Sequence, residues 1–316
     1  MAITIPGIDD LLAAHDRIRP FVHRTPLVTC ETLDRMTGAE LVFKCENLQK
    51  VGAFKYRGAT SAVQSLDDAT AARGVATHSS GNHAQALSLA ARTRGIPAYV
   101  VMPTSAPAVK RDAVAGYGAE IIPCEPTLQA REETLARVVA DTGAHFVHPY
   151  DDPRVIAGQG TAALELFEDA GPLDAVITPV GGGGLLSGTA IAAVHRAPGC
   201  RVYAAEPEGA DDAARSLAGG VLVPSVDPDT ICDGLLTSLS ERTFAIIRAH
   251  VTGIVTVSDD AVVQALRLVY ERMKLVVEPS AVVGLAALLT RREAVAGRRI
   301  GVVFSGGNVD LSRPWF

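Results

Sequence analysis

The stretch AVITPVGGGGLLSGTAIAAVHRA, residues 175–197, decides the fold of this 316-residue chain. It opens with a β-branched run, turns on four successive glycines and continues with the apolar spacing of a helix. Strand, tight turn and helix in this order form the unit from which parallel sheets are built. The first 20 residues of the stretch are uncharged and long enough to cross a membrane, but Pro179 and the glycines interrupt them. We therefore predict a buried strand–turn–helix unit and no membrane segment.

The same alternation of strands and helices continues along the whole chain. β-Rich runs occupy residues 40–46, 74–79, 98–103, 119–124, 145–149, 175–180, 201–206, 254–258 and 300–305. Helix-period segments lie between them at residues 83–95, 128–143, 160–171, 185–197 and 259–274. The alternation predicts an α/β fold of two open, twisted, mainly parallel sheets, with helices on both faces and the ligand cleft between the sheets.

The composition is that of a globular, enzyme-sized chain. Lys and Arg number 29 and Asp and Glu number 35, so the formal charge is −6, and 48% of the residues are apolar. A core of this size excludes intrinsic disorder, and the acidic balance argues against nucleic-acid binding, which needs a basic face. The five cysteines have no CxxC spacing and the N-terminus has no secretory signal, so we expect reduced thiols and a cytoplasmic location.

Gly181 to Gly184 expose backbone N–H groups at the start of a predicted helix, where the helix dipole also favours an anion. Three interpretations remain open for this turn: a phosphate site, a nicotinamide dinucleotide site, and a tight turn without a ligand. The dinucleotide interpretation takes Gly182, Gly184 and Ser187 as a variant of GxGxxG, with Glu206 as the ribose-binding acid. No Lys-Ser/Thr pair follows the glycines, so the turn is not a P-loop.

Lys55 is one of only five lysines, and small and aromatic residues surround it in VGAFKYRGA, residues 51–59. A lysine that attacks a carbonyl must be neutral, and a desolvated setting favours this by lowering its pKa. By itself the residue is a weak signal, because most lysines are solvated surface charges.

Three further segments carry polar side chains where α/β folds bind ligands. THSSGNH (77–83) either caps the following helix or binds a substrate carboxylate through its N–H and hydroxyl groups. SGGN (305–308) follows the last strand and is either a glycine turn or a ligand contact. AEPEGADD (205–212) is either a solvated acidic loop or an oxygen-ligand site for a hard cation.

Together these segments resemble the serine/threonine dehydratase and serine racemase family of fold-type II pyridoxal-phosphate enzymes, which share a tryptophan synthase β-like fold. The matching pieces occur in the family's order and cover nearly the whole chain: ENLQKVGAFKYRGA (46–59), SSGNHAQAL (79–87), VIAGQGT (155–161), GGGGL (181–185), AAEPEGADD (204–212), EPSAVVG (278–284) and SGGNVD (305–310). The resemblance implies a catalytic role for Lys55 and strongly disfavours the nicotinamide interpretation. It implies a large cofactor-binding domain of residues 1–69 and 150–316, a small mobile domain of residues 70–149, and the cofactor in the cleft between them.

The resemblance also implies a role for each matching site residue. Lys55 would link to the cofactor and move protons on one face of the substrate, and Ser80 would act on the other face. Asn82 would meet the cofactor's 3′-oxygen and Ser305 its pyridine nitrogen, in a cofactor site made of Phe54, Lys55, Asn82, Gly181, Gly182, Gly183, Gly184, Leu185 and Ser305. The substrate carboxylate would bind to Ser79, Ser80, Asn82 and His83. A divalent cation (Mg, Ca or Mn) would bind Glu206, Asp212 and the carbonyl of Ala210.

The implied reaction is a β-elimination that converts L-threonine or L-serine to 2-oxobutanoate or pyruvate and ammonia. Serine racemase activity and 3-hydroxyaspartate dehydration are the alternatives, since Ser80 matches the opposite-face acid of serine racemases. Leu236 stands where several relatives that act on hydroxyaspartate have Arg, which favours a neutral substrate, and Asp152 replaces an expected His. The resemblance further implies a homodimer that acts on small amino acids, without nucleic-acid or membrane partners.

Overall fold

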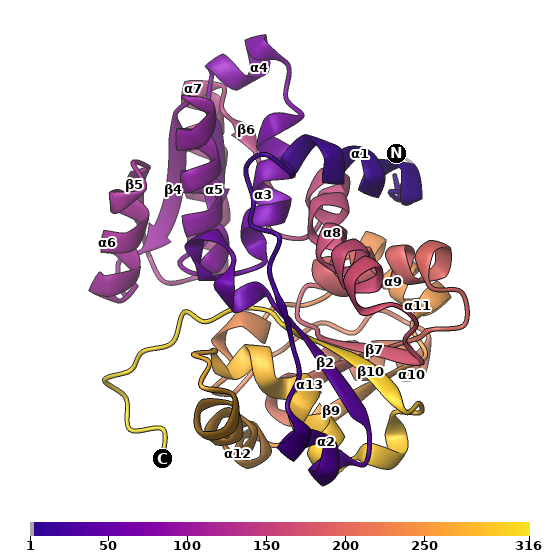
Figure 1. Ribbon diagram of the computed structural model, residues 1–316. Helices are drawn as coiled ribbons and strands as arrows, with labels where there is room; N and C mark the ends of the chain where they lie inside the picture. The colour runs from indigo at the N-terminus through magenta and orange to yellow at the C-terminus, as the bar shows by residue number, and fades with distance from the viewer. Residues whose placement is uncertain (1–2) are drawn as a thin grey trace.

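The computed structural model describes residues 3–316, and it places the strands in two sheets (Figure 1). The strands are β1 Leu27–Val28, β2 Glu40–Cys45, β3 Val75–His78, β4 Ala98–Pro103, β5 Glu120–Cys124, β6 His145–Phe146, β7 Ala175–Pro179, β8 Arg201–Pro207, β9 Gly253–Val257 and β10 Arg299–Phe304. The larger sheet has the order β1-β2-β10-β7-β8-β9 and the smaller sheet the order β5-β4-β3-β6. Every neighbouring pair is parallel except β1 and β2. The prediction of two mainly parallel sheets is confirmed.

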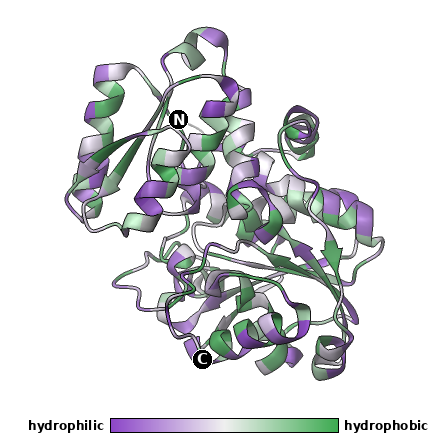
Figure 2. Cartoon of the chain, turned by 60° about the vertical axis from the view of Figure 1, so that its left-hand side comes forward, coloured by the Kyte–Doolittle hydropathy of each residue, from purple (hydrophilic) through white to green (hydrophobic). Residues whose placement is uncertain are grey.

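Helices cover both faces of each sheet. Their bounds are α1 Ile8–Ile18, α2 Glu31–Thr37, α3 Lys55–Gln64, α4 Asp68–Ala72, α5 Asn82–Arg94, α6 Ala108–Gly116, α7 Leu128–Thr142, α8 Pro153–Ala170, α9 Gly184–Arg196, α10 Asp212–Gly219, α11 Glu241–His250, α12 Asp259–Leu268 and α13 Pro279–Thr290. Helices α2, α12 and α13 lie on one face of the larger sheet, and α1, α8, α9 and α11 lie on the other. The smaller sheet lies between α7 and the pair α5 and α6. Figure 2 shows the resulting pattern of hydrophobic strands inside and hydrophilic outer helix faces.

Local sequence signals explain most element boundaries. All nine predicted strands are present, and the two-residue β1 was missed because it is too short to show a period. Gly95 and Gly143 end α5 and α7 in the left-handed region, with φ of 74° and 69°. Helix α8 begins at Pro153, seven residues before the predicted start at 160, because the Asp152 side chain caps it and Pro suits the first helical position.

Small residues bring α8 and α9 into close contact and thereby position the glycine turn. A Cβ added to Gly160 of α8 would lie 2.9 Å from the carbonyl oxygen of Gly188 in α9. Both helices are buried over most of their length, so their apolar burial fixes their places on the sheet. The Gly181–Gly184 turn, which joins β7 to α9, is consequently held at the carboxyl end of the larger sheet.

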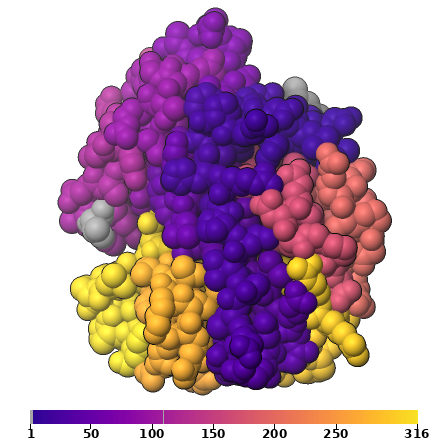
Figure 3. Space-filling view, in the orientation of Figure 1, coloured from indigo at the N-terminus to yellow at the C-terminus, as the bar shows by residue number. Residues whose placement is uncertain are grey.

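The two sheets come from separate parts of the chain. All four strands of the smaller sheet lie within residues 75–146, and all six of the larger sheet lie outside that range. Figure 3 shows the N-terminal segment, in indigo, running down one face of the molecule across both lobes. Among the helices of residues 3–316, none has the length and apolar character needed to cross a membrane.

Candidate active site

Lys55 is the first residue of α3, next to the end of β10. Its Nζ donates a hydrogen bond to the carbonyl oxygen of Pro149 at 3.0 Å and lies 5.1 Å from the centroid of the Phe54 ring. The backbone N–H of Phe54 donates to the carbonyl oxygen of Ser305 at 2.9 Å, which ties the lysine loop to the end of β10. Burial lowers the pKa of Lys55 to about 8, against the opposing effect of the Glu278 carboxylate. Near pH 8, a large fraction of the amine is therefore neutral and nucleophilic.

The glycine turn presents a row of free amide donors. Within residues 3–316, the backbone N–H groups of Gly181 through Leu185 donate to no acceptor, although most of this turn is buried. Buried N–H groups need partners, and a helix N-terminus favours an anionic one. A Cβ added to Gly182 would overlap the Tyr150 ring, so the close packing requires glycine here. These residues fit a phosphate group.

The loop after β3 carries the expected substrate-binding residues. Ser79 and Ser80 follow the strand directly, and the Ser79 hydroxyl accepts from the N–H of Gly81 at 3.3 Å. The amide N–H groups of residues 82–84, in the first turn of α5, have no acceptor in the described part of the chain. A carboxylate bound at this turn would satisfy them.

His83 in this loop has a buried side chain that bonds to the chain after β6. Its Nε2 lies 3.1 Å from the carbonyl oxygen of Val147, so Nε2 carries the proton. Burial lowers the pKa of His83 to about 3, and the charge of Lys55 adds to the effect. The imidazole is then neutral, and its Nδ1 is a lone-pair acceptor that finds no partner in residues 3–316. A substrate carboxylate would therefore meet the backbone N–H of His83, because the free ring nitrogen repels it.

Asn82 is held between Glu278 and Asn308, which flank elements of the larger sheet. Its Nδ2 donates to the Glu278 carboxylate at 2.9 and 3.2 Å, and its Oδ1 accepts from Asn308 Nδ2 at 2.8 Å. Burial raises the pKa of Glu278 to about 7. Glu278 lies within the EPSAVVG segment, but sequence reasoning assigns it no role, because one glutamate at the start of a helix is normally a solvated capping group.

Glu206 near the end of β8, Ala210 in the turn that follows and Asp212 at the start of α10 are close in sequence and in space. Burial raises the pKa of Glu206 to about 8 and also raises the pKa of Asp212. Glu206 Oε1 accepts from the N–H of Ala214 at 2.6 Å, whereas Asp212 Oδ2 is buried without a partner in residues 3–316. A divalent cation would supply that partner and keep both carboxylates ionised, so the residues fit one. Since the described chain contains no group of three His, Cys, Asp or Glu side chains placed as metal ligands, such an ion would also need carbonyl oxygens and water.

The loop from His148 to Asp152 is a part of the site that the sequence did not reveal. The carbonyl of Pro149 holds Lys55, and Tyr150 packs on the glycine turn. The His148 Nδ1 accepts from the N–H of Asp151 at 2.9 Å. Asp152, found where a His was expected, accepts from the N–H of Arg154 at 2.8 Å as the cap of α8. Only the Asp-Pro pair before a helical pattern could have signalled this loop.

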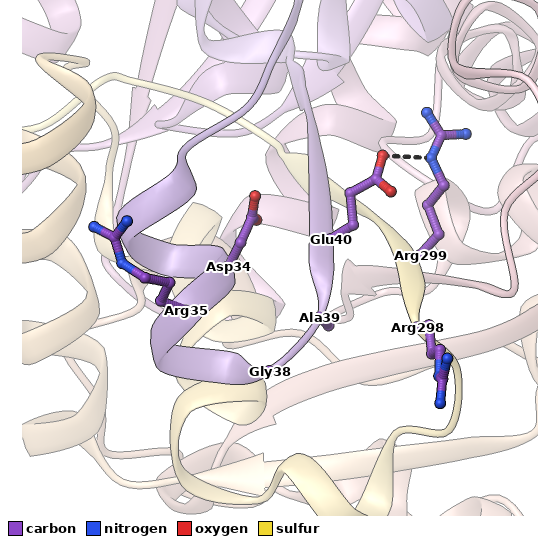
Figure 4. Close-up of a pocket in the computed structure, with 7 residues that line it drawn as sticks. All are labelled: Asp34, Arg35, Gly38, Ala39, Glu40, Arg298 and Arg299. Carbon is purple, nitrogen blue, oxygen red and sulfur yellow. Dashed lines mark hydrogen bonds and ion pairs between the residues drawn. The ribbon is translucent and has the colours of Figure 1, made fainter.

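A surface pocket among the described residues lies away from this site. It has a volume of about 610 Å³ and is lined by Asp34, Arg35, Gly38, Ala39, Glu40, Arg298 and Arg299 (Figure 4). Glu40 and Arg299, which pair at 2.6 Å, begin β2 and β10. The pocket is therefore at the amino ends of the strands, opposite to the end where parallel sheets bind ligands.

Known proteins share both this sequence and this fold. A family model for pyridoxal-phosphate dependent enzymes matches residues 18–306. The chain belongs to this family. Beta-hydroxyaspartate dehydratase from Paracoccus denitrificans (strain Pd 1222) is 55% identical to it, over 98% of this chain and 99% of the relative. The crystal structure of serine racemase from Dictyostelium discoideum matches with a TM-score of 0.93 and 48% identity, over 97% of this chain and 99% of that one. The structure of maize serine racemase matches with a TM-score of 0.96 and 44% identity, over 99% of this chain and 96% of that one.

Membership of the pyridoxal-phosphate family bears on the three interpretations of the glycine turn. The chain has the fold of a fold-type II enzyme, so the nicotinamide interpretation is set aside. The protein is a pyridoxal-phosphate-dependent enzyme of the ammonia-lyase and racemase group. Its relatives act on different amino acids, so the substrate must be argued from this chain's own residues.

Proposed function

We propose that this protein is a dehydratase with 3-hydroxyaspartate as its preferred substrate. It eliminates water from a β-hydroxy-α-amino acid, and hydrolysis of the resulting imine takes up one water and releases ammonia and a 2-oxo acid. The reaction type is inferred from one observation: the buried amine of Lys55 donates to the Pro149 carbonyl in a site that also contains the five free amide donors of the glycine turn. Bound pyridoxal phosphate supplies the electron sink that makes the Cα proton of an amino acid acidic. Lys55 Nζ takes that proton, and the free amides of Gly181 to Leu185 hold the cofactor's phosphate.

The hydroxyl of Ser305 favours β-elimination over reactions that need a long-lived negative charge at the substrate's Cα. Its hydroxyl follows β10 and is the group expected at the pyridine nitrogen. A neutral hydroxyl does not keep that nitrogen protonated as a carboxylate would, so negative charge at Cα is short-lived and a β-hydroxyl is lost promptly.

Arg131 supports a substrate with a second carboxylate. It lies in the first turn of α7, just after the carboxyl end of β5, and its charge is close enough to contribute to the lowered pKa of His78, which burial mainly causes. Its side chain makes no hydrogen bond or ion pair within residues 3–316, and its Nε is buried. The buried Nε has lost its contact with water without gaining a protein partner, and a ligand carboxylate can supply that partner. The 55% identical beta-hydroxyaspartate dehydratase supports the same substrate.

Leu236 is the feature that favours the expected substrates, L-threonine and L-serine. It follows the turn Asp233–Leu235, which packs against Gly181, so it lies near the cofactor's phosphate end. Its side chain is 36% exposed, and a partly solvated Leu does not exclude a carboxylate as strongly as an unpaired Arg attracts one. We therefore rank 3-hydroxyaspartate above threonine and serine.

A substrate panel tests this ranking. We expect Arg131→Gln to lower kcat/KM for 3-hydroxyaspartate about 100-fold, the usual scale for breaking a buried charge pair, and to change kcat/KM for L-serine less than about threefold. Arg137→Gln, on the same helix, is the matched control, because Arg137 only donates to Thr134 at 3.0 Å. Equal losses on both substrates, or a higher wild-type kcat/KM for threonine, would contradict the ranking.

Racemisation is a second candidate activity, because Ser80 lies in the substrate loop and the 48% identical structure is a serine racemase. We expect Ser80→Ala to lower racemisation of L-serine at least about 100-fold, since it removes the opposite-face acid, and to lower elimination from L-serine less than about tenfold. Chiral chromatography and 2-oxo acid release measure the two rates. Parallel loss of both would show that Ser80 only shapes the loop.

Two expectations about assembly belong to the same proposal. The Asn82–Glu278 hydrogen bond joins α5, beside the smaller sheet, to the start of α13, beside the larger one. This contact supports a small domain of residues 70–149 that closes on the substrate, which would then meet the free amides of α5. We further propose a homodimer of the 33.0 kDa chain, to be checked by sedimentation equilibrium. The cytoplasmic location remains an expectation from the sequence.

A further inference from the structure

Gln159, in the second turn of α8, touches three parts of the active site. It is fully buried, and its Nε2 donates to the carbonyl oxygen of Pro149 at 3.3 Å. A Cβ added to Gly58 of α3 would lie 2.9 Å from its Cγ, and one added to Gly184 would overlap its Oε1. One side chain thus contacts the lysine helix, the loop that holds the lysine, and the phosphate turn.

The carbonyl of Pro149 therefore accepts two hydrogen bonds, one from Gln159 and one from Lys55. A carbonyl oxygen has two lone pairs, and a donor fixed on one of them directs the second donor to the other. A neutral lysine amine has two N–H bonds and a single lone pair. When one N–H points to a fixed oxygen, the range of directions open to the lone pair is restricted.

We propose that Gln159 is a positioning residue that fixes the Pro149 carbonyl and, through it, aims the lone pair of Lys55 at the substrate's Cα proton. The inference rests on the proposed function only in taking Lys55 as the group that removes this proton. This positioning role explains why the polar amide of Gln159 is buried at a position that an apolar side chain could fill. The Oε1 of Gln159 is buried with no partner in residues 3–316, so its desolvation is uncompensated. A glutamine kept at that cost has a task for its Nε2 donor.

Two substitutions at this position separate positioning from packing. Gln159→Met keeps the length of the side chain and removes the donor. Gln159→Glu keeps the shape, but it can donate to Pro149 only when its carboxyl is protonated. The matched control is Thr60→Val on α3, since the Thr60 hydroxyl is also buried without a partner in the described chain but lies more than a turn beyond Lys55.

For Gln159→Met we expect kcat to fall about 10- to 100-fold with KM changed less than about threefold, and exchange of the Cα proton with D2O to slow by the same factor. The primary deuterium isotope effect from Cα-deuterated substrate should rise, because proton removal becomes the slow step. The activity of Gln159→Glu relative to wild type should rise as pH falls, while that of Gln159→Met stays low at every pH. Thr60→Val should match wild type within about twofold.

A second measurement does not depend on catalysis, so it distinguishes lost positioning from a variant that has simply folded poorly. The rate at which the apoprotein takes up pyridoxal phosphate, measured against pH, reports the neutral fraction of Lys55. Loss of a fixed acceptor for the ammonium should move this profile to lower pH in Gln159→Met. Unchanged uptake and exchange, or an equal loss in Thr60→Val, would overturn the proposal. If the wild type exchanged no Cα proton at all, the proposed function would fail, and the uptake profile would still decide the role of Gln159.

Discussion

Lys55 owes its reactivity to two opposing influences. Burial removes water from its ammonium form and lowers its pKa to about 8, while Glu278 opposes this shift through its negative charge. The Pro149 carbonyl also stabilises the ammonium form through a hydrogen bond. The balance leaves a lysine that is neutral often enough to act, yet still anchored at a defined position.

This balance predicts the pH dependence of cofactor uptake. Only the neutral amine attacks the aldehyde of pyridoxal phosphate, so the uptake rate of the apoprotein should rise with pH, by about tenfold per unit below about pH 8, and level off above it. Stopped-flow absorbance on the apoprotein measures this profile. A midpoint above about pH 10 would show that Lys55 keeps the pKa of a solvated lysine.

Some site residues can be predicted from the sequence and others cannot. Lys55 and the four glycines stand in segments whose order matches a family, so their roles follow from the motif. The roles of Pro149 and Gln159 depend on a backbone carbonyl and on the hydrogen bond that Gln159 Nε2 donates to it, and residue types alone reveal neither. Glu278 belongs to a matching segment, but only the structure shows that Asn82 binds it.

At the scale of elements, buried charges join α3, α8 and β2. Glu165 of α8 accepts from Lys44 at 2.6 Å and from Arg57 at 2.7 and 2.8 Å, and Arg57 also donates to Glu46 at 2.7 and 2.8 Å. Two cations and two carboxylates thus balance inside the protein with their hydrogen bonds largely satisfied. The network fixes the helix that begins at Lys55.

Removing one charge should destabilise this network strongly. We expect Glu165→Gln to lower the free energy of unfolding by at least about 3 kcal/mol, because it leaves buried positive charge uncompensated. Glu168→Gln is the control on the same helix. Glu168 pairs with Arg24 at 3.0 Å, but its side chain is 50% exposed, so we expect a change below about 1 kcal/mol. Urea unfolding compares the two, and similar losses would contradict a special role for the buried network.

The elements themselves were largely predictable. Nine strands follow from β-branched runs, and α5 and α7 end at their glycines as expected. The early start of α8 was not predicted, because Gly158 and Gly160 weaken its helical pattern. Those glycines are present because α3 and α9 cross α8 at close range, which is a tertiary requirement.

For the whole molecule, a cation bound at Glu206 and Asp212, as we propose, would make the stability depend on metal. Binding to the folded state raises Tm, so we expect EDTA to lower Tm and added Mg²⁺, Ca²⁺ or Mn²⁺ to restore it. Asp212→Asn should abolish this response, because it removes the carboxylate oxygen that has no partner in residues 3–316. A Tm that does not respond to EDTA or to any of the three ions would show that Glu206 and Asp212 are protonated instead.

The division of the strands into two sheets is also a property of the whole molecule. The glycine turn follows β7 of the larger sheet, and the loop that carries Ser79 and Ser80 follows β3 of the smaller one. The reacting groups therefore meet only when the two parts of the chain are correctly placed. The order of strands in the sequence predicted two sheets, but the contacts between them depend on side chains far apart in sequence, such as Asn82 and Glu278.

The decisive experiment is to quantify the 2-oxo acid and ammonia released from 3-hydroxyaspartate by the purified protein loaded with pyridoxal phosphate. We predict equimolar oxaloacetate and ammonia from the wild type, and no product from Lys55→Ala. L-Threonine and L-serine should give their 2-oxo acids more slowly in the same assay. Absence of 2-oxo acid from all three substrates, with the cofactor bound, would contradict the proposed dehydratase function.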